Sequence, residues 1–176
     1  RRRIMSEKRR LLGMTLDELK RVAFEAGLPG YAAKQMADWL YKKKVTSIAA
    51  MTNIASAKRA LLEKNFEVGA VPPSDLMKSV DGTIKYLYPA GPGNFVESVY
   101  IPTEDRATLC VSSQVGCKMN CLFCMTGKQG FTKNLSANEI LNQIQSLPET
   151  EELTNIVFMG MGEPLDNVDE LFKVLE

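Results

Sequence analysis

The chain has 176 residues, a formal net charge of +1 and 45% hydrophobic residues. This composition is sufficient for a folded core and excludes global disorder, while the near-neutral charge leaves the class of partner open. The sequence has no apolar run long enough to span a bilayer and no signal-peptide segment at its start, so we expect a soluble, cytoplasmic protein. It contains four cysteines and no histidine. The lack of histidine excludes metal sites with histidine ligands and acid–base catalysis by histidine within the chain.

Basic residues gather in two places. They are Arg1, Arg2, Arg3, Lys8, Arg9 and Arg10 at the start, and Lys42, Lys43 and Lys44 further along. Either cluster could face the phosphates of a nucleic acid. A solvated face and a frayed terminus explain the same residues equally well, so both interpretations stay open.

The first third of the chain has the pattern of a small helical domain. Thr15 and Glu18 form a capping box, which satisfies free backbone N–H groups where a helix begins. Trp39 lies in phase with an apolar stripe, so we expect it to anchor the core of this domain and not to stack on a base. Helices are expected over residues 15–26, 31–43 and 56–65.

After Pro72 and Pro73 the hydrophobic period changes from that of a helix to that of strands. Residues 76–80 and 83–88 flank Asp81-Gly82, which predicts a hairpin with a two-residue turn. Residues 95–101 alternate as a further strand and place Glu97 on the same face as apolar side chains.

From Thr108 onward, strands alternate with helices. Ser136 and Glu139 form a second capping box, which begins a helix between two strands. Repeated β–α units imply a parallel sheet with helices outside it. The expected order is a strand at 108–112, a loop at 116–130, a helix from 136, a buried strand at 156–159, a turn at 160–164 and a helix from 168.

Three cysteines lie in one short loop with the spacing C-x3-C-x2-C: Cys117, Cys121 and Cys124. In a reducing compartment such a group indicates metal binding or catalysis and not disulfides. A [4Fe–4S] cluster takes thiolate ligands, and three of them leave the fourth iron open to an outside ligand. In radical S-adenosylmethionine (SAM) enzymes that ligand is the cofactor, which then supplies the radical chemistry.

Other metal proteins use cysteines differently. A structural zinc site could take Cys110 as its fourth thiolate, although zinc sites favour two separated cysteine pairs. A ferredoxin-type electron carrier favours a tighter C-x2-C-x2-C-x3-C run. The zinc alternative leads to a different function, a zinc-binding module that contacts RNA without catalysis.

A glycine-rich turn, residues 160–164, follows the strand expected at 156–159. Glycines at the carboxyl end of a parallel strand allow the backbone to approach a ligand closely. Glu163 in this turn could accept a hydrogen bond from an ammonium group such as that of a methionine moiety. A capping carboxylate at a simple strand–helix turn is the alternative for Glu163.

With these motifs the sequence resembles the radical SAM RNA methyltransferases that methylate carbon 2 of adenine in large-subunit ribosomal RNA and in transfer RNA. The similar stretches are residues 99–102, 106–117, the cysteine loop with Thr126-Gly127, 159–165, and, in the helical start, 33–36 and 39–41.

The resemblance implies a role for each candidate site residue. It assigns cluster ligation to Cys117, Cys121 and Cys124, SAM contact to Gly162 and Glu163, proton abstraction to Glu97, and a second catalytic role to Cys110. In that family a methyl group is first placed on a C-terminal cysteine, and a covalent adduct with the adenine is later resolved. A surface carboxylate and a small core thiol are the alternatives for Glu97 and Cys110.

The resemblance also implies an organisation. We expect an α+β fold with a helical RNA-binding accessory domain (1–70), a β-hairpin connector (71–106) and the first β/α units of a truncated radical SAM partial barrel (107–176). Such a fragment lacks the methyl-carrying cysteine and is inactive alone. The expected partners are 23S ribosomal RNA, transfer RNA and an external electron donor, with the protein a monomer. Methylation of adenine carbon 8, as in a related resistance enzyme, is the alternative reaction.

Overall fold

The structure is a computed structural model that describes residues 8–176. The chain divides into two compact units, Arg1–Gly69 and Ala70–Glu176. Arg1, Arg2 and Arg3, which belong to the predicted basic start, lie outside the described residues. Among the residues that are described, no helix has both the length and the apolar character needed to cross a membrane.

The first unit is helical, as the sequence predicts. Thr15 and Glu18 form the expected capping box at the start of α1, with the Glu18 carboxylate accepting the Thr15 N–H at 2.9 Å. A parallel pair of two-residue strands escaped prediction because two residues carry no alternation. The elements are β1 (Arg9–Arg10), α1 (Leu16–Glu25), α2 (Ala32–Ala37), a π-helical turn (Asp38–Lys42), a 3-10 turn (Ile48–Ala50), α3 (Ser56–Asn65) and β2 (Phe66–Glu67).

Trp39 does not anchor the core of the helical unit, which corrects the sequence prediction. It lies in the π-helical turn, whose wider winding moves side chains out of the 3.6-residue phase on which the prediction rested. The indole is half-buried, donates a hydrogen bond to Asn53 Oδ1 at 2.6 Å and is covered by the Lys43 ammonium group. Smaller side chains fill the core instead, among them Leu19, Val22, Met36, Leu40 and Leu62.

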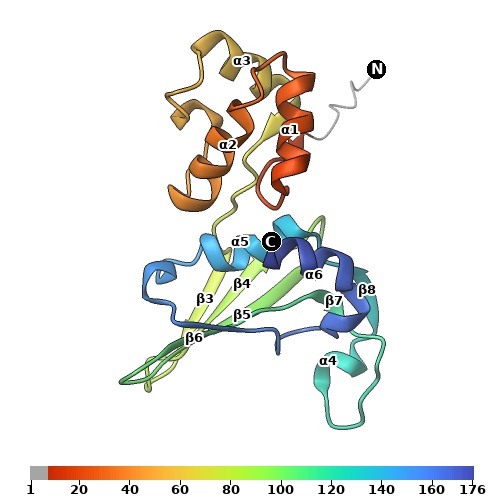
Figure 1. Cartoon of the computed structure of the whole chain (residues 1–176). Helices are drawn as coiled ribbons and strands as arrows, with labels where there is room; N and C mark the ends of the chain where they lie inside the picture. Colours follow the sequence, from red (N-terminus) through yellow and green to blue (C-terminus); the bar gives the residue numbers. More distant parts are fainter. Residues whose placement is uncertain (1–7) are drawn as a thin grey trace. The chain divides into compact units, whose positions relative to one another are not determined.

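The second unit is built on one five-stranded sheet in the order β3-β4-β5-β6-β9. The β6–β9 pair is parallel, as predicted, and the other pairs are antiparallel. A separate two-stranded ribbon, β7–β8, flanks the cysteine loop, which projects from the end of the ribbon in Figure 1. The strands are β3 (Asp75–Lys78), β4 (Ile84–Pro89), β5 (Phe95–Pro102), β6 (Ala107–Cys110), β7 (Gln114–Gly116), β8 (Phe131–Asn134) and β9 (Asn155–Val157); the helices are α4 (Met125–Lys128), α5 (Ala137–Gln145) and α6 (Val168–Leu175).

The segment 71–106 is part of this sheet and not a separate connector. Its strands β3, β4 and β5 continue into β6 through four residue pairs between β5 and β6. The hairpin is present, but its turn is longer than the predicted two residues. Ser79 N–H donates to the Thr83 carbonyl at 2.8 Å, leaving a three-residue loop in which Gly82 takes the positive φ of 87°. Such loops with glycine in the left-handed region suit the twist of the strands.

The core of the second unit lies between one face of the sheet and the helices α5 and α6, which cover that face in Figure 1. Ile140 of α5 and Tyr86, Tyr88 and Leu109 of the sheet are fully buried there. The strand expected to be buried, β9, is the exception. It is an edge strand of the described sheet, and Ile156 keeps 42% of its surface exposed.

Candidate active site at the carboxyl edge of the parallel strands

The two predicted cofactor motifs meet at one edge of the sheet. The chain leaves β6 through residues 111–113 to reach the cysteine loop, and it leaves β9 to form the glycine-rich turn. Backbone hydrogen bonds join the two exits, from Val111 N–H to the Val157 carbonyl at 2.8 Å and from Ser113 N–H to the Met161 carbonyl at 2.9 Å. Ligands of parallel α/β sheets bind at this carboxyl edge.

The cysteine loop is closed at its base by two glycines. Gly116 has a φ of 75°, and a Cβ atom there would lie 1.8 Å from the carbonyl oxygen of Gly130. Cys117 N–H donates to that same oxygen at 3.0 Å. No residue with a side chain fits at position 116, so the approach of the two backbones is what starts and ends the loop.

The three loop cysteines are free thiols with partial access to solvent. Cys121 is exposed, and Cys117 and Cys124 are half-buried. A hydrogen bond from the backbone N–H of Gly127, with smaller contributions from Thr126, lowers the pKa of the Cys124 thiol. A lowered pKa favours the thiolate, which is the form that binds metal.

This donor set fits an iron–sulfur cluster. Within residues 8–176, no three side chains of Cys, Asp or Glu converge as a site for a single metal ion. A [4Fe–4S] cube binds each thiolate at a different iron, so its ligands need not converge on one point. Cys110, which the zinc alternative requires as fourth ligand, lies within the sheet between Val99 and Val157.

The glycines of the turn after β9 serve the packing of the chain on itself. A Cβ atom on Gly162 would lie 2.5 Å from Cβ of Gln114, and one on Gly160 would lie 2.7 Å from Ser112 Oγ. The sequence interpretation, close approach to a ligand, left out this requirement. The Glu163 carboxylate accepts the Leu165 N–H at 3.1 Å, so it caps the following 3-10 turn.

Glu97 and Cys110 lie on the face of the sheet opposite the helices. Val99 of β5 pairs with Cys110 of β6, and Glu97 is two residues from Val99, so both candidate residues point to the same side. The Glu97 carboxylate is 3.3 Å from the Lys85 ammonium group and keeps 44% of its side-chain surface exposed. Burial raises the pKa of the Cys110 thiol, which keeps the thiol protonated at neutral pH.

Buried amide side chains that the sequence analysis missed hold the path into the cysteine loop. Gln143 of α5 donates to the Ser112 carbonyl and accepts the Ser112 N–H, both at 2.9 Å. Asn167 donates to the carbonyl oxygens of Ser113 and Leu135 at 2.9 and 2.8 Å. One sequence signal was available, because Gln143 falls three residues after Ile140 on the buried side of an amphipathic helix.

Comparisons with known proteins find relatives for both units of the chain. Residues 111–176 match the radical SAM superfamily, and residues 10–68 match the ribosomal RNA large subunit methyltransferase N-terminal domain. A crystal structure of a radical SAM methyltransferase from Sphaerobacter thermophilus is similar with a TM-score of 0.85 and 36% identity, over 95% of this chain and 51% of that chain. The second unit is therefore similar in sequence and in fold to the first part of a radical SAM protein.

Curated relatives narrow the family further. The chain is 82% identical to a probable dual-specificity RNA methyltransferase RlmN of Parabacteroides distasonis, over 98% of this chain and 50% of the relative. It is 63% identical to the protein of that name from Bacteroides thetaiotaomicron, with the same coverage. It is 46% identical to the dual-specificity RNA methyltransferase RlmN of Geobacter sulfurreducens, over 93% of this chain and 46% of that protein. The chain is thus similar to RlmN proteins over nearly its whole length, and it spans about half the length of these relatives.

Similarity to the radical SAM superfamily and to RlmN proteins implies a [4Fe–4S] cluster and SAM as cofactors. The cysteine loop contains the three thiols that such a cluster needs, at the carboxyl edge where a ligand of the sheet would bind. The predicted α+β fold with the start of a radical SAM domain is confirmed by the structure and by the Sphaerobacter thermophilus neighbour.

Proposed function

We propose that the chain is part of a radical SAM methyltransferase that methylates carbon 2 of adenine in 23S ribosomal RNA and in transfer RNA. One observation carries the proposal: the C-x3-C-x2-C loop and the glycine-rich turn are joined by backbone hydrogen bonds at one sheet edge. The choice of RNA as substrate is supported by the names of the relatives. An external electron donor, a monomeric state and a cytoplasmic location belong to the same proposal.

The residues of the chain divide the work. Cys117, Cys121 and Cys124 would hold the cluster, and Glu163 with the backbone at Gly162 would contact SAM. When bound, the cluster and SAM supply the one-electron chemistry and the methyl group. Glu97 and Cys110 share the sheet face that the helices leave uncovered, so a base and a thiol are available on one side of the sheet.

In this proposal Glu97 accepts a proton from the adenine adduct. Cys110 then attacks the sulfur of the methyl-carrying cysteine in the C-terminal half: a disulfide forms, the bond between that sulfur and the transferred carbon breaks, and the thiol proton passes to that carbon to complete the methyl group. The ion pair with Lys85 orients the Glu97 carboxylate toward this face. The Cys110 thiol accepts a backbone hydrogen bond from Met159, which fixes it beside the exit of β9. A general base must lie within hydrogen-bond reach of its proton, and a strand gives such a group a rigid support.

The test uses this chain joined to the C-terminal half of the Parabacteroides distasonis relative, hereafter the joined protein. After anaerobic reconstitution with iron and sulfide, we expect about four irons per protein, the content of one [4Fe–4S] cluster, and 2-methyladenosine in a ribosomal RNA fragment and in transfer RNA. Alanine at Cys117, Cys121 or Cys124 should abolish both. Cys110→Ala should keep the cluster and lose the methylated product.

Each other outcome has a distinct meaning. Zinc in place of iron and sulfide would contradict the radical SAM assignment and support the zinc-binding module. Formation of 8-methyladenosine would support the alternative reaction. Loss of the cluster in the Cys110→Ala protein would show a four-cysteine site.

A further inference from the structure

A series of polar contacts connects the cysteine loop to the glycine-rich turn. The Lys118 ammonium group, in the loop, lies 3.1 Å from Asp166 Oδ2. The same carboxylate oxygen accepts a hydrogen bond from Gln114 Nε2 at 2.9 Å. At the other end of its amide, Gln114 Oε1 accepts the backbone N–H of Glu163 at 2.9 Å. A cation next to one candidate cluster ligand is thus linked to the backbone of the candidate SAM-contacting residue.

Gln114 is held rigidly at the centre of this series of contacts. Its side chain is completely buried, and Nε2 also donates to Asn134 Oδ1 at 2.8 Å. Its Cβ and Cγ atoms occupy the space that a side chain at Gly162 would need. Because a buried polar group that is fully bonded resists displacement, Gln114 fixes the turn relative to β7.

At the other end of this series of contacts, in the cysteine loop, Lys118 is held by two different contacts. Besides the Asp166 carboxylate, its ammonium group lies 4.4 Å from the centre of the Phe131 ring. Phe131 begins β8, the strand that closes the loop, so Lys118 connects the loop both to its own base and to the segment after β9. Lys128, which is in the same loop and exposed, provides an unlinked comparison.

We propose that Lys118, Asp166 and Gln114 are positioning residues that hold the cysteine loop at a fixed separation from Glu163. This inference rests on the proposed function, in which SAM contacts the cluster at one end and Glu163 at the other. A ligand that spans two segments binds more tightly when their separation is already set, because binding then orders less of the protein. The three side chains connect those two segments.

Four variants of the joined protein test the proposal. Lys118→Met and Asp166→Asn break the link at two different residues and keep the size of each side chain. Lys118→Arg restores an ion pair with Asp166, and Lys128→Met removes the same charge from the same loop without touching Asp166. We measure iron and sulfide content, SAM affinity by equilibrium dialysis, and the change that SAM causes in the electron paramagnetic resonance spectrum of the reduced cluster.

Lys118→Met and Asp166→Asn should keep the cluster and weaken SAM binding by about threefold, because the Lys118–Asp166 ion pair is partly exposed to solvent. Both should alter the spectral change caused by SAM. Lys118→Arg and Lys128→Met should behave like the unsubstituted protein. Equal SAM affinity in Lys118→Met and Lys128→Met would overturn the proposal and leave the function intact, whereas absence of SAM binding in the unsubstituted protein would count against the function.

Hydrogen exchange on the 176-residue chain gives a readout that needs no cofactor. Lys118→Met should speed the exchange of backbone amides in both 117–130 and 160–163, since the link stabilises two segments. Lys128→Met should leave the second segment unchanged. Faster exchange in the loop alone would show that Lys118 stabilises only its own loop, and the positioning role would be refuted.

Discussion

Glu97 and Lys85 form an ion pair on a sheet face where the sequence predicted apolar neighbours for the carboxylate. The prediction rightly placed Glu97 opposite the buried residues Val96 and Ser98, but it did not foresee a cation on the neighbouring strand. Lys85 lies diagonally across from Glu97 in β4, a position that strand periodicity cannot indicate before the strand register is known.

If Glu97 is the proton acceptor, its removal should stop the reaction after the radical step. We expect Glu97→Gln in the joined protein to form 5′-deoxyadenosine normally but to release little methylated RNA, with a covalent protein–RNA species retained on a denaturing gel. Glu104→Gln, an exposed carboxylate in the turn after β5, is the matched control. A normal yield of methylated RNA from Glu97→Gln would make Glu97 a structural partner of Lys85.

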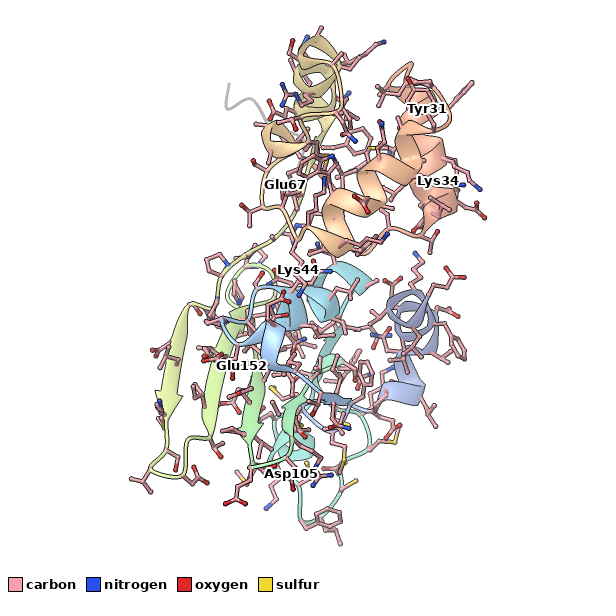
Figure 2. The ribbon with its side chains drawn as sticks, turned by 60° about the vertical axis from the view of Figure 1, so that its left-hand side comes forward. Tyr31, Lys34, Lys44, Glu67, Asp105 and Glu152 are labelled. Carbon is pink, nitrogen blue, oxygen red and sulfur yellow. The ribbon has the colours of Figure 1, made fainter. Side chains whose placement is uncertain are left out.

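At the scale of elements, two tyrosine–glutamate contacts fix the crossover between α5 and β9 to the sheet. The Tyr86 hydroxyl donates to the Glu149 carboxylate at 2.8 Å, and the Tyr100 hydroxyl donates to Glu152 at 2.7 Å. Glu152 is labelled in Figure 2. The Glu152 hydrogen bond, together with burial, raises the pKa of Tyr100 to about 12, so this hydroxyl remains a donor at neutral pH.

Two neighbouring tyrosines allow the contact to be measured. Tyr86 and Tyr88 are both 1% exposed, but among residues 8–176 the Tyr88 hydroxyl has no hydrogen-bond partner. Tyr86→Phe leaves the Glu149 carboxylate without its donor and should lower the free energy of unfolding by about 1–2 kcal/mol. Tyr88→Phe should change it by less than about 0.5 kcal/mol or raise it, because it removes an unbonded buried hydroxyl.

Urea unfolding followed by circular dichroism measures both changes. Trp39, the single tryptophan, lies in the other unit. Its fluorescence should therefore report an unchanged unfolding transition for that unit. Equal destabilisation by the two substitutions would mean that ring packing, and not the hydroxyl contact, controls the crossover.

Local patterns predicted the elements well, and long-range contacts account for the misses. Both capping boxes and the parallel β6–β9 pair were predicted, since three-residue spacings and β–α alternation can be read along the chain. The β7–β8 ribbon and the Gln114–Asp166 contact join residues that are far apart in sequence. Nothing in the periodicity of either segment indicates the other, so only the folded structure reveals them.

At the scale of the whole molecule, several basic residues are already paired with carboxylates, so fewer of them are available to contact RNA than their number implies. Arg9 pairs with Glu25 at 2.8 Å, and Lys42 pairs with Asp38 at 3.3 Å. Tyr31 and Lys34 are a better candidate surface. Both are exposed, they are three residues apart near the start of α2, and Figure 2 shows them on the outside of the helical unit. An aromatic side chain beside a cation suits contact with RNA.

Removal of residues 1–69 from the joined protein should therefore weaken RNA binding while SAM cleavage stays detectable. Lys34→Gln should reduce the slope of log affinity against log salt concentration by about one. Lys20→Gln, whose lysine is paired with Asp17 at 2.7 Å, is the control and should have little effect. Filter binding across a salt series provides the measurement, and unchanged affinity after the deletion would assign RNA contact to the second unit.

The glycine pair at the base of the cysteine loop makes this loop an insert that can be exchanged as a unit. Gly116 and Gly130 bring the two ends of residues 117–129 together through their backbones, and Lys118 adds a contact to Asp166 in the turn after β9. A protein engineer could exchange the residues between the two glycines, provided that Lys118 is kept, without redesigning a strand. Evolution has the same freedom, so the chemistry at the loop can diversify while the scaffold beneath it is inherited unchanged.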